Sequence, residues 1–123
     1  MILVDASIWI DHIRSPDASL QPLLDANEVA CHPFIIGEVA LGHIRPRDAV
    51  LAGLKILPSA IIAADGEVVQ LIDRYQLTGS GLGYVDAHLL ASSLLTVDCL
   101  LWTRDKKLKE FASRLGTAAK GLN

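Results

Sequence analysis

The chain opens with Met1-Ile2-Leu3-Val4-Asp5, an apolar run that ends abruptly at a carboxylate. Such a run predicts a short buried strand, and the acid after it falls at the strand's carboxyl end. Further apolar runs predict strands at 28–32, 60–63 and 99–102. Helical periodicity and capping residues predict helices over 7–14, 17–27, 33–44, 47–57, 65–77, 84–96 and 104–115.

Short apolar strands that alternate with helices predict an α/β domain built on a parallel sheet. Right-handed crossovers place the helices on both faces of that sheet. The segment after Gly116 gives no firm strand, so we expect four or five strands in all. A length of 123 residues fits a single domain over 1–123. In such sheets, ligands bind at the carboxyl ends of the strands.

Composition and charge are uneven along the chain. Half of the residues are hydrophobic (51%) and the mean hydropathy is +0.39, which indicates a well-filled core, an apolar oligomer face, or both. The net charge of −3 argues mildly against a nucleic-acid-binding protein. Residues 104–123 nevertheless carry +4, which leaves −7 for the remainder. A basic end and an acidic body suit phosphate and metal respectively, although a solvated helix face would look the same.

Two features of the sequence predict the compartment. Cys31 and Cys99 both lie in apolar runs, so we expect buried free thiols, as in a reducing environment. No basic segment followed by a long apolar stretch precedes Asp5, which predicts neither a signal peptide nor a membrane anchor. We therefore expect a cytoplasmic protein.

Four acids are predicted to meet at the carboxyl edge of the sheet. Asp5 ends the first strand, and Glu38 lies in the helix that follows the second strand. Asp86 begins the helix that leads into the last strand, and Asp105 comes shortly after that strand. Each has a simpler role open to it, because strand ends favour turn-forming acids and first helical turns favour any carboxylate. Glu38 is the hardest to explain in that way, because its helix is otherwise apolar and a buried carboxylate needs a partner.

Crowded carboxylates repel one another, and a divalent cation relieves that repulsion. Oxygen donors favour Mg²⁺ or Mn²⁺ over zinc, and no histidine (His12, His32, His43, His88) has ligand-like spacing with a cysteine. A metal held by Asp5, Glu38, Asp86 and Asp105 would acidify water for in-line attack on phosphorus. These four residues are the predicted catalytic and metal-binding groups.

Supporting residues are predicted next to these acids. Ser7 and Thr103 are expected to cap helices, to hydrogen-bond a carboxylate or metal-bound water, or both. The basic residues around Asp105 are the expected phosphate contacts. They are Arg104, Lys106, Lys107 and Lys109. The glycine-rich loop 79–83 is expected to act as a mobile hinge before Asp86.

Four blocks of the sequence resemble the VapC-type PIN-domain toxins, in that family's order and spacing. They are Ile2-Leu3-Val4-Asp5-Ala6-Ser7-Ile8-Trp9-Ile10-Asp11, Pro33-Phe34-Ile35-Ile36-Gly37-Glu38-Val39-Ala40-Leu41-Gly42, Gly83-Tyr84-Val85-Asp86-Ala87 and Leu101-Trp102-Thr103-Arg104-Asp105-Lys106-Lys107-Leu108. The family's acidic site corresponds to Asp5, Glu38, Asp86 and Asp105. Ala6 departs from the pattern, because many members carry a hydroxyl residue there.

The resemblance implies a PIN-like three-layer α/β/α sandwich with a central parallel sheet. It also implies a Mg²⁺- or Mn²⁺-dependent endoribonuclease that leaves a 5′-phosphate and a 3′-hydroxyl, with tRNA or an rRNA loop as typical targets. Members of the family usually form homodimers and are inhibited by a VapB-type antitoxin, which can push an arginine into the acidic pocket.

Two other functions remain open from the sequence. One is a PIN-like module that binds RNA or a partner protein without cutting. The other is a phospho-receiver, which has a similar size and an acidic metal pocket. A receiver requires paired acids after its first strand, whereas Ala6 follows Asp5 here.

Overall fold

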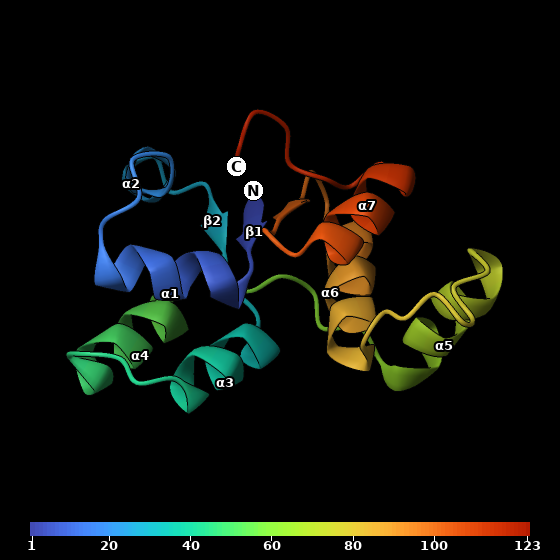
Figure 1. The fold of residues 1–123 in the computed structure, drawn as a ribbon, viewed down its shortest axis with the longest axis horizontal. Helices are drawn as coiled ribbons and strands as arrows, with labels where there is room; N and C mark the ends of the chain where they lie inside the picture. The colour runs from blue at the N-terminus through green and yellow to red at the C-terminus, as the bar shows by residue number, and fades with distance from the viewer.

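A three-stranded parallel sheet lies at the centre of the chain, whose computed structural model describes residues 1–123. Its strands are β1 (Ile2–Val4), β2 (Val29–Ala30) and β3 (Leu100–Trp102), arranged in the order β2-β1-β3 (Figure 1). β1 is paired in parallel with both neighbours, so that Ile2 aligns with Val29 and Leu100. The opening residues of the sequence therefore form the central strand.

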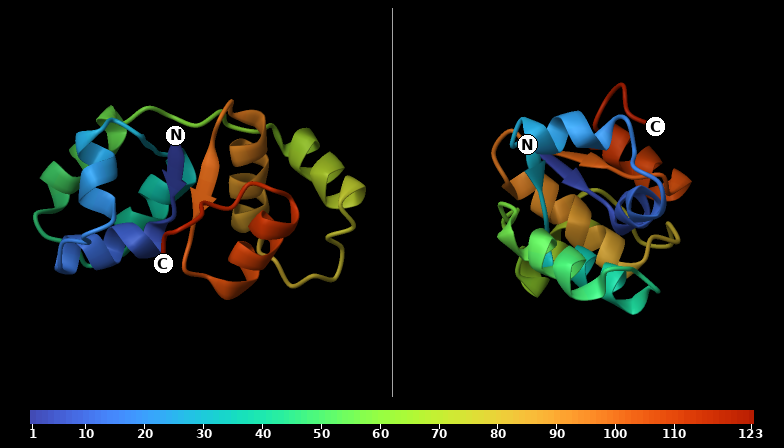
Figure 2. Two further views of the ribbon diagram at one scale, coloured as in Figure 1. Left: turned by 90° about the horizontal axis from the view of Figure 1, so that it is seen from above. Right: turned by 90° about the vertical axis from the view of Figure 1, so that its left-hand side faces the viewer.

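Helices cover both faces of this sheet. They are α1 (Ala6–Arg14), α2 (Leu20–Asp25), α3 (Pro33–Leu41), α4 (Arg47–Ile56), α5 (Asp65–Arg74), α6 (Tyr84–Leu95) and α7 (Lys106–Arg114). Figures 1 and 2 show α1–α4 on one side of the strands and α5–α7 on the other. The predicted three-layer α/β/α fold is confirmed. None of the seven helices combines the length and apolar character needed to cross a membrane.

The sheet is smaller than the four or five strands predicted. The segment 60–63 was expected to be a strand, but pairing there is limited to one isolated bridge between Cys31 and Ser59. Ala60 donates its backbone N–H to the Cys31 carbonyl at 2.9 Å, and the next N–H, that of Ile61, donates to the Thr96 hydroxyl at 2.8 Å. The pairing ends here because α3 begins two residues after Cys31, at Pro33, which has no backbone N–H to donate.

The opposite edge behaves in the same way. Ala118 forms one isolated bridge with Leu101, and Ala119 donates its backbone N–H to the Leu101 carbonyl at 2.9 Å. The Leu101 N–H in turn donates to Thr117 at 2.7 Å. The chain after Gly116 therefore lies beside β3 without becoming a regular strand.

The core occupies both sides of the sheet. It contains 29 buried hydrophobic residues, among which Leu3, Ile8, Leu90 and Trp102 are fully or almost fully inaccessible. These four come from β1, α1, α6 and β3, so the central strands are sealed between the two helical layers. Both cysteines are buried and free. The apolar composition is explained in large part by this interior.

Candidate active site

Asp5 is held at the carboxyl end of β1 by two hydrogen bonds. It is 7% exposed. Its Oδ1 accepts from the backbone N–H of Ala6 at 2.8 Å, which makes Asp5 the N-cap of α1. Its Oδ2 accepts from the Thr103 hydroxyl at 2.8 Å. Strand and helix therefore fix this carboxylate in one orientation.

Thr103 and Asp105 reach the same place from β3. Because Val4 aligns with Trp102, the residues that follow these two, Asp5 and Thr103, are neighbours across the sheet. The Thr103 hydroxyl also accepts from the Asp105 backbone N–H at 3.1 Å. Thr103 was expected to cap the last helix, but Asp105 does so, because its Oδ1 accepts from Leu108 N–H at 2.9 Å. Thr103 instead bridges two of the four acids.

Asp86 lies in the first turn of α6, as predicted, and is partly buried. Burial raises the pKa of its carboxyl group from 3.8 to about 6, and repulsion from Asp5 and Asp105 adds to the increase. Its Oδ2 is also 3.9 Å from where a Cβ on Gly83 would lie. Asp86 thus lies within the electrostatic reach of two acids from other elements.

Glu38 completes the group from α3, although its side chain is exposed at the rim. Partial burial raises the pKa of its carboxyl group, and the charges on Asp5 and Asp86 raise it further. Each of the four acids therefore repels at least one other member of the group. The structure brings together at one edge four carboxylates from four different elements.

A divalent cation suits this donor set, because all the charged donors are carboxylate oxygens. None of the four acids is ion-paired with a lysine or arginine, so their repulsion is uncompensated within the chain. The side chains do not, however, form a ready-made metal-binding group of three or more residues. The chemistry of the site therefore fits a cation, while the ligand side chains would have to adjust to enclose it.

Comparison with known proteins identifies the fold family. The PIN domain family matches residues 2–113. This chain belongs to the PIN-domain family. Two relatives, each called ribonuclease VapC32 and found in two strains of Mycobacterium tuberculosis, are 48% identical over 118 residues, which cover 96% of this chain and 95% of theirs. The chain is thus a VapC-type PIN domain. No solved structure gave a significant match.

Ser7 does not have the position predicted for it in this PIN domain. It was expected to cap the first helix, but α1 begins one residue earlier, at Ala6, with Asp5 as its cap. The Ser7 hydroxyl oxygen is buried and has no hydrogen-bond partner. No carboxylate accepts a hydrogen bond from it, and Asp5 is held by Ala6 and Thr103 instead.

Arg104 is bound to other parts of the PIN domain. Its guanidinium donates to Asp11 and Asp17, each at 2.7 Å, and lies 5.8 Å from the centre of the Trp102 ring. The hydrogen bond from Arg104 also holds the pKa of the Asp17 carboxyl group below its ordinary value. Its expected contact with RNA phosphate would require this double ion pair to open.

Lys106 and Lys107 are exposed in the first turn of α7, beside Asp105. The Lys107 ammonium lies against Gly81, so tightly that a Cβ at this position would collide with it. Gly81 also has a φ of +84°, a left-handed conformation that favours glycine. The loop that precedes α6 thus packs against the start of α7, and Lys106 remains free of such a contact.

A buried histidine cluster behind the acids was not anticipated from the sequence. His32 caps α3 by accepting from Phe34 N–H at 3.0 Å, and His88 on α6 lies 3.1 Å from Asp65. The Phe34 ring packs edge-on against both imidazoles, at 5.1 and 4.9 Å. The cluster therefore joins α3 to α6, the helices that carry Glu38 and Asp86. The signal in the sequence was His32 directly before a helix-starting proline.

Proposed function

We propose that this PIN domain is a Mg²⁺- or Mn²⁺-dependent endoribonuclease and the toxin of a toxin–antitoxin pair. The observation that carries the proposal is the grouping of four carboxylates without a basic partner at the carboxyl edge of the sheet, where burial and then mutual repulsion raise the pKa values of Glu38 and Asp86. The relatives named as ribonucleases support RNA as the substrate. A phospho-receiver is set aside, because the chain belongs to a different family.

The four acids would hold the cation through their oxygens. When bound, the ion supplies positive charge that offsets the phosphate and increases the acidity of water. Asp5 is the best-fixed of the four, because Ala6 N–H and the Thr103 hydroxyl leave its carboxylate little freedom. Glu38, exposed at the rim, has the most freedom to adjust to the substrate. Lys106 and Lys107 would meet the RNA backbone next to the reacting phosphate.

Partners and location follow from the same proposal. We expect a structured RNA such as tRNA or rRNA as the target, a VapB-type antitoxin as the inhibitor, and a homodimer in the cytoplasm. Leu41, Ile56 and Val97 are each more than 80% exposed, and burying such side chains against another chain would be favourable. A binding module that does not cut RNA is the remaining alternative.

RNA-end mapping is the direct test of the proposed function. The purified chain, incubated with total bacterial RNA and Mn²⁺ or Mg²⁺, should create a small set of new internal ends that bear 5′-phosphates. Expression of the chain without an antitoxin should create the same ends in cells. RNA that is bound and recovered intact under these conditions would favour the binding module instead.

Replacing Thr103 by valine should slow cleavage by roughly 10- to 100-fold, the usual effect of removing a residue that orients a metal ligand. The substitution keeps the side-chain shape but removes the hydroxyl that donates to Asp5 and accepts from the Asp105 N–H. Thr103→Ser keeps that hydroxyl and should restore most of the rate. The measurement is the initial cleavage rate of all three chains at saturating RNA. Equal losses in the valine and serine variants would contradict this positioning role.

A further inference from the structure

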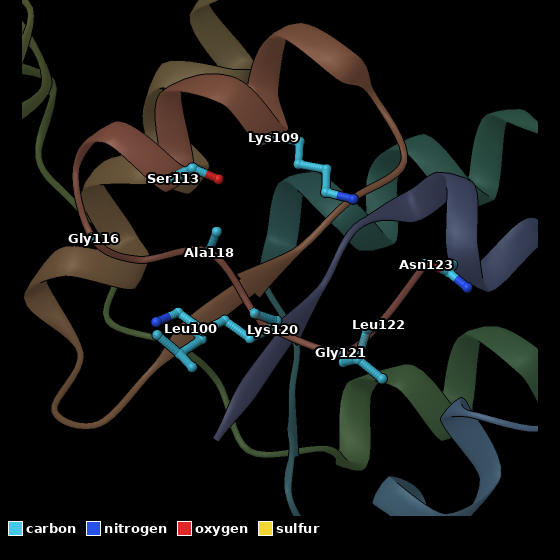
Figure 3. A pocket seen from close by; sticks show the side chains of 10 residues that line it. Leu100, Lys109, Ser113, Gly116, Ala118, Lys120, Gly121, Leu122 and Asn123 are labelled. Carbon is cyan, nitrogen blue, oxygen red and sulfur yellow. The ribbon is translucent and has the colours of Figure 1, made fainter.

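A basic cavity lies next to the acidic site, between α7 and the chain after Gly116. It has a volume of about 770 Å³. Figure 3 shows the C-terminal residues 116–123 crossing beneath α7, with Leu100 of β3 at the base. The polar side chains that line it are those of Lys109, Ser113, Lys120 and Asn123. No acid lines this cavity, in contrast to the neighbouring site.

The positive charge of the cavity is uncompensated. The ion pairs of the chain involve only Arg104 and His88, so neither Lys109 nor Lys120 has an acidic partner. Arg104 is the basic residue of the C-terminal region that Asp11 and Asp17 neutralise. The +4 charge of residues 104–123 is therefore concentrated on the lysines and on Arg114. A negatively charged ligand is the expected occupant.

The placement of the two lysines favours an extended ligand over a single anion. In Figure 3, the Lys109 ammonium points toward the Asn123 end of the cavity, whereas the Lys120 ammonium points toward the Gly116 end. The two ammonium groups therefore point away from each other and could not both contact one small anion. A chain of phosphates, with charges spaced along a backbone, matches this arrangement, and a free phosphate ion does not.

The cavity begins close to the acidic site along α7. Lys109 N–H donates to the Asp105 carbonyl at 2.9 Å, so Lys109 lies four residues beyond an acid of the site, a rise of about 6 Å along the helix. At the other boundary, the Asn123 backbone oxygen accepts from Arg104 Nε at 2.6 Å, next to Asp105 in sequence. A nucleic-acid strand that leaves the acidic site along α7 would enter the cavity.

We propose that this cavity binds the sugar–phosphate backbone of single-stranded RNA beyond the reacting phosphate, with Lys109 and Lys120 contacting successive parts of it. This inference rests on the proposed ribonuclease function and names a second subsite for its substrate. The contacts are to phosphates, so they add affinity for any RNA sequence and do not select bases.

The test measures RNA affinity against salt concentration. Asp86→Asn protein, in which cleavage is expected to be abolished, is titrated with a fluorescent unstructured RNA oligonucleotide at several salt concentrations. Adding Lys109→Gln and Lys120→Gln should flatten the slope of log affinity against log salt by about 1.4, since each phosphate contact on a single strand contributes about 0.7. Lys109→Arg with Lys120→Arg should keep the original slope, because the charges remain.

The matched control is Arg47→Gln with Lys55→Gln on α4, which removes the same charge from the opposite layer of the fold. These two residues are exposed, and the control should leave the slope unchanged. A slope that both double variants change equally, or that neither changes, would overturn the inference. So would loss of inorganic phosphate binding in the Lys109/Lys120 variant with an unchanged RNA slope. If the unsubstituted chain binds RNA with the predicted lysine dependence but never cuts it, the proposed function fails and the cavity assignment stands.

Discussion

Asp86→Asn is expected to lower the rate of RNA cleavage by at least about 100-fold, because even residues that only orient metal ligands give losses of 10- to 100-fold. Asp86 is partly buried and repels both Asp5 and Asp105, which places it among the acids of the site. Asparagine has nearly the same shape but removes the charge that attracts a cation. Cleavage of the mapped RNA target and growth arrest on expression should be lost together.

Asp73→Asn is the matched control, because Asp73 is an exposed acid on α5 without a side-chain partner. It should leave both cleavage and growth arrest unchanged. Full toxicity of the Asp86 variant would mean that the acids do not carry the activity.

The Asp86 variant should also remain folded. A carboxyl group whose pKa rises on folding, here from 3.8 to about 6, binds its proton more tightly in the folded chain. This group therefore destabilises the metal-free chain progressively as pH rises through that interval, and the effect persists at neutral pH. Asparagine removes it, so urea unfolding in chelator at pH 7 should show a variant at least as stable as the unsubstituted chain. An unfolded variant would disqualify the cleavage comparison.

Chelation should stop cleavage completely, and Mn²⁺ or Mg²⁺ should restore it. The reason is that the four acids have no basic partner in the chain, so a divalent cation is what can oppose their charge beside a phosphate. The measurement is the cleavage rate of protein dialysed against EDTA, before and after each metal is added back.

Thermal melting provides the control for metal binding itself. Adding Mn²⁺ should raise the melting temperature of the dialysed chain, since a ligand that binds only the folded state stabilises it. The Asp86→Asn variant should show a smaller increase. Cleavage that survives exhaustive dialysis against EDTA would exclude the metal-dependent mechanism.

The layers of this fold and the acids at its edge could be predicted because they depend on local sequence. The run 2–4 is apolar and β-branched at both ends, and it forms the central strand. Asp5 follows a strand, and Asp86 lies in the first turn of a helix. The order of strands and helices in a parallel sheet then places both residues at the same edge. The parallel register of the strands places Thr103 as well, since the pairing of Val4 with Trp102 brings Asp5 beside Thr103.

The features that could not be predicted depend on contacts between distant segments. Nothing local to Ile61 indicates that its N–H donates to the Thr96 hydroxyl, 35 residues away. Arg104 resembles a free phosphate contact until the fold brings Asp11 and Asp17 to it from 93 and 87 residues away. The histidine cluster is hidden for the same reason, because His32 and His88 meet only through Phe34.

Two acids of the site have a second task, which affects how the site should be dissected. The carboxylate oxygens of Asp5 and Asp105 accept hydrogen bonds from the first turns of α1 and α7 and so cap these helices. Alanine at either position would also remove this N-cap, a change that destabilises a helix by roughly 0.5–2 kcal/mol. If an alanine variant were inactive, the loss of the carboxylate's chemistry could not be separated from the destabilisation of the helix that it caps. Asparagine caps helices about as well as aspartate, so it separates the charge from the cap and is the cleaner probe at both ends.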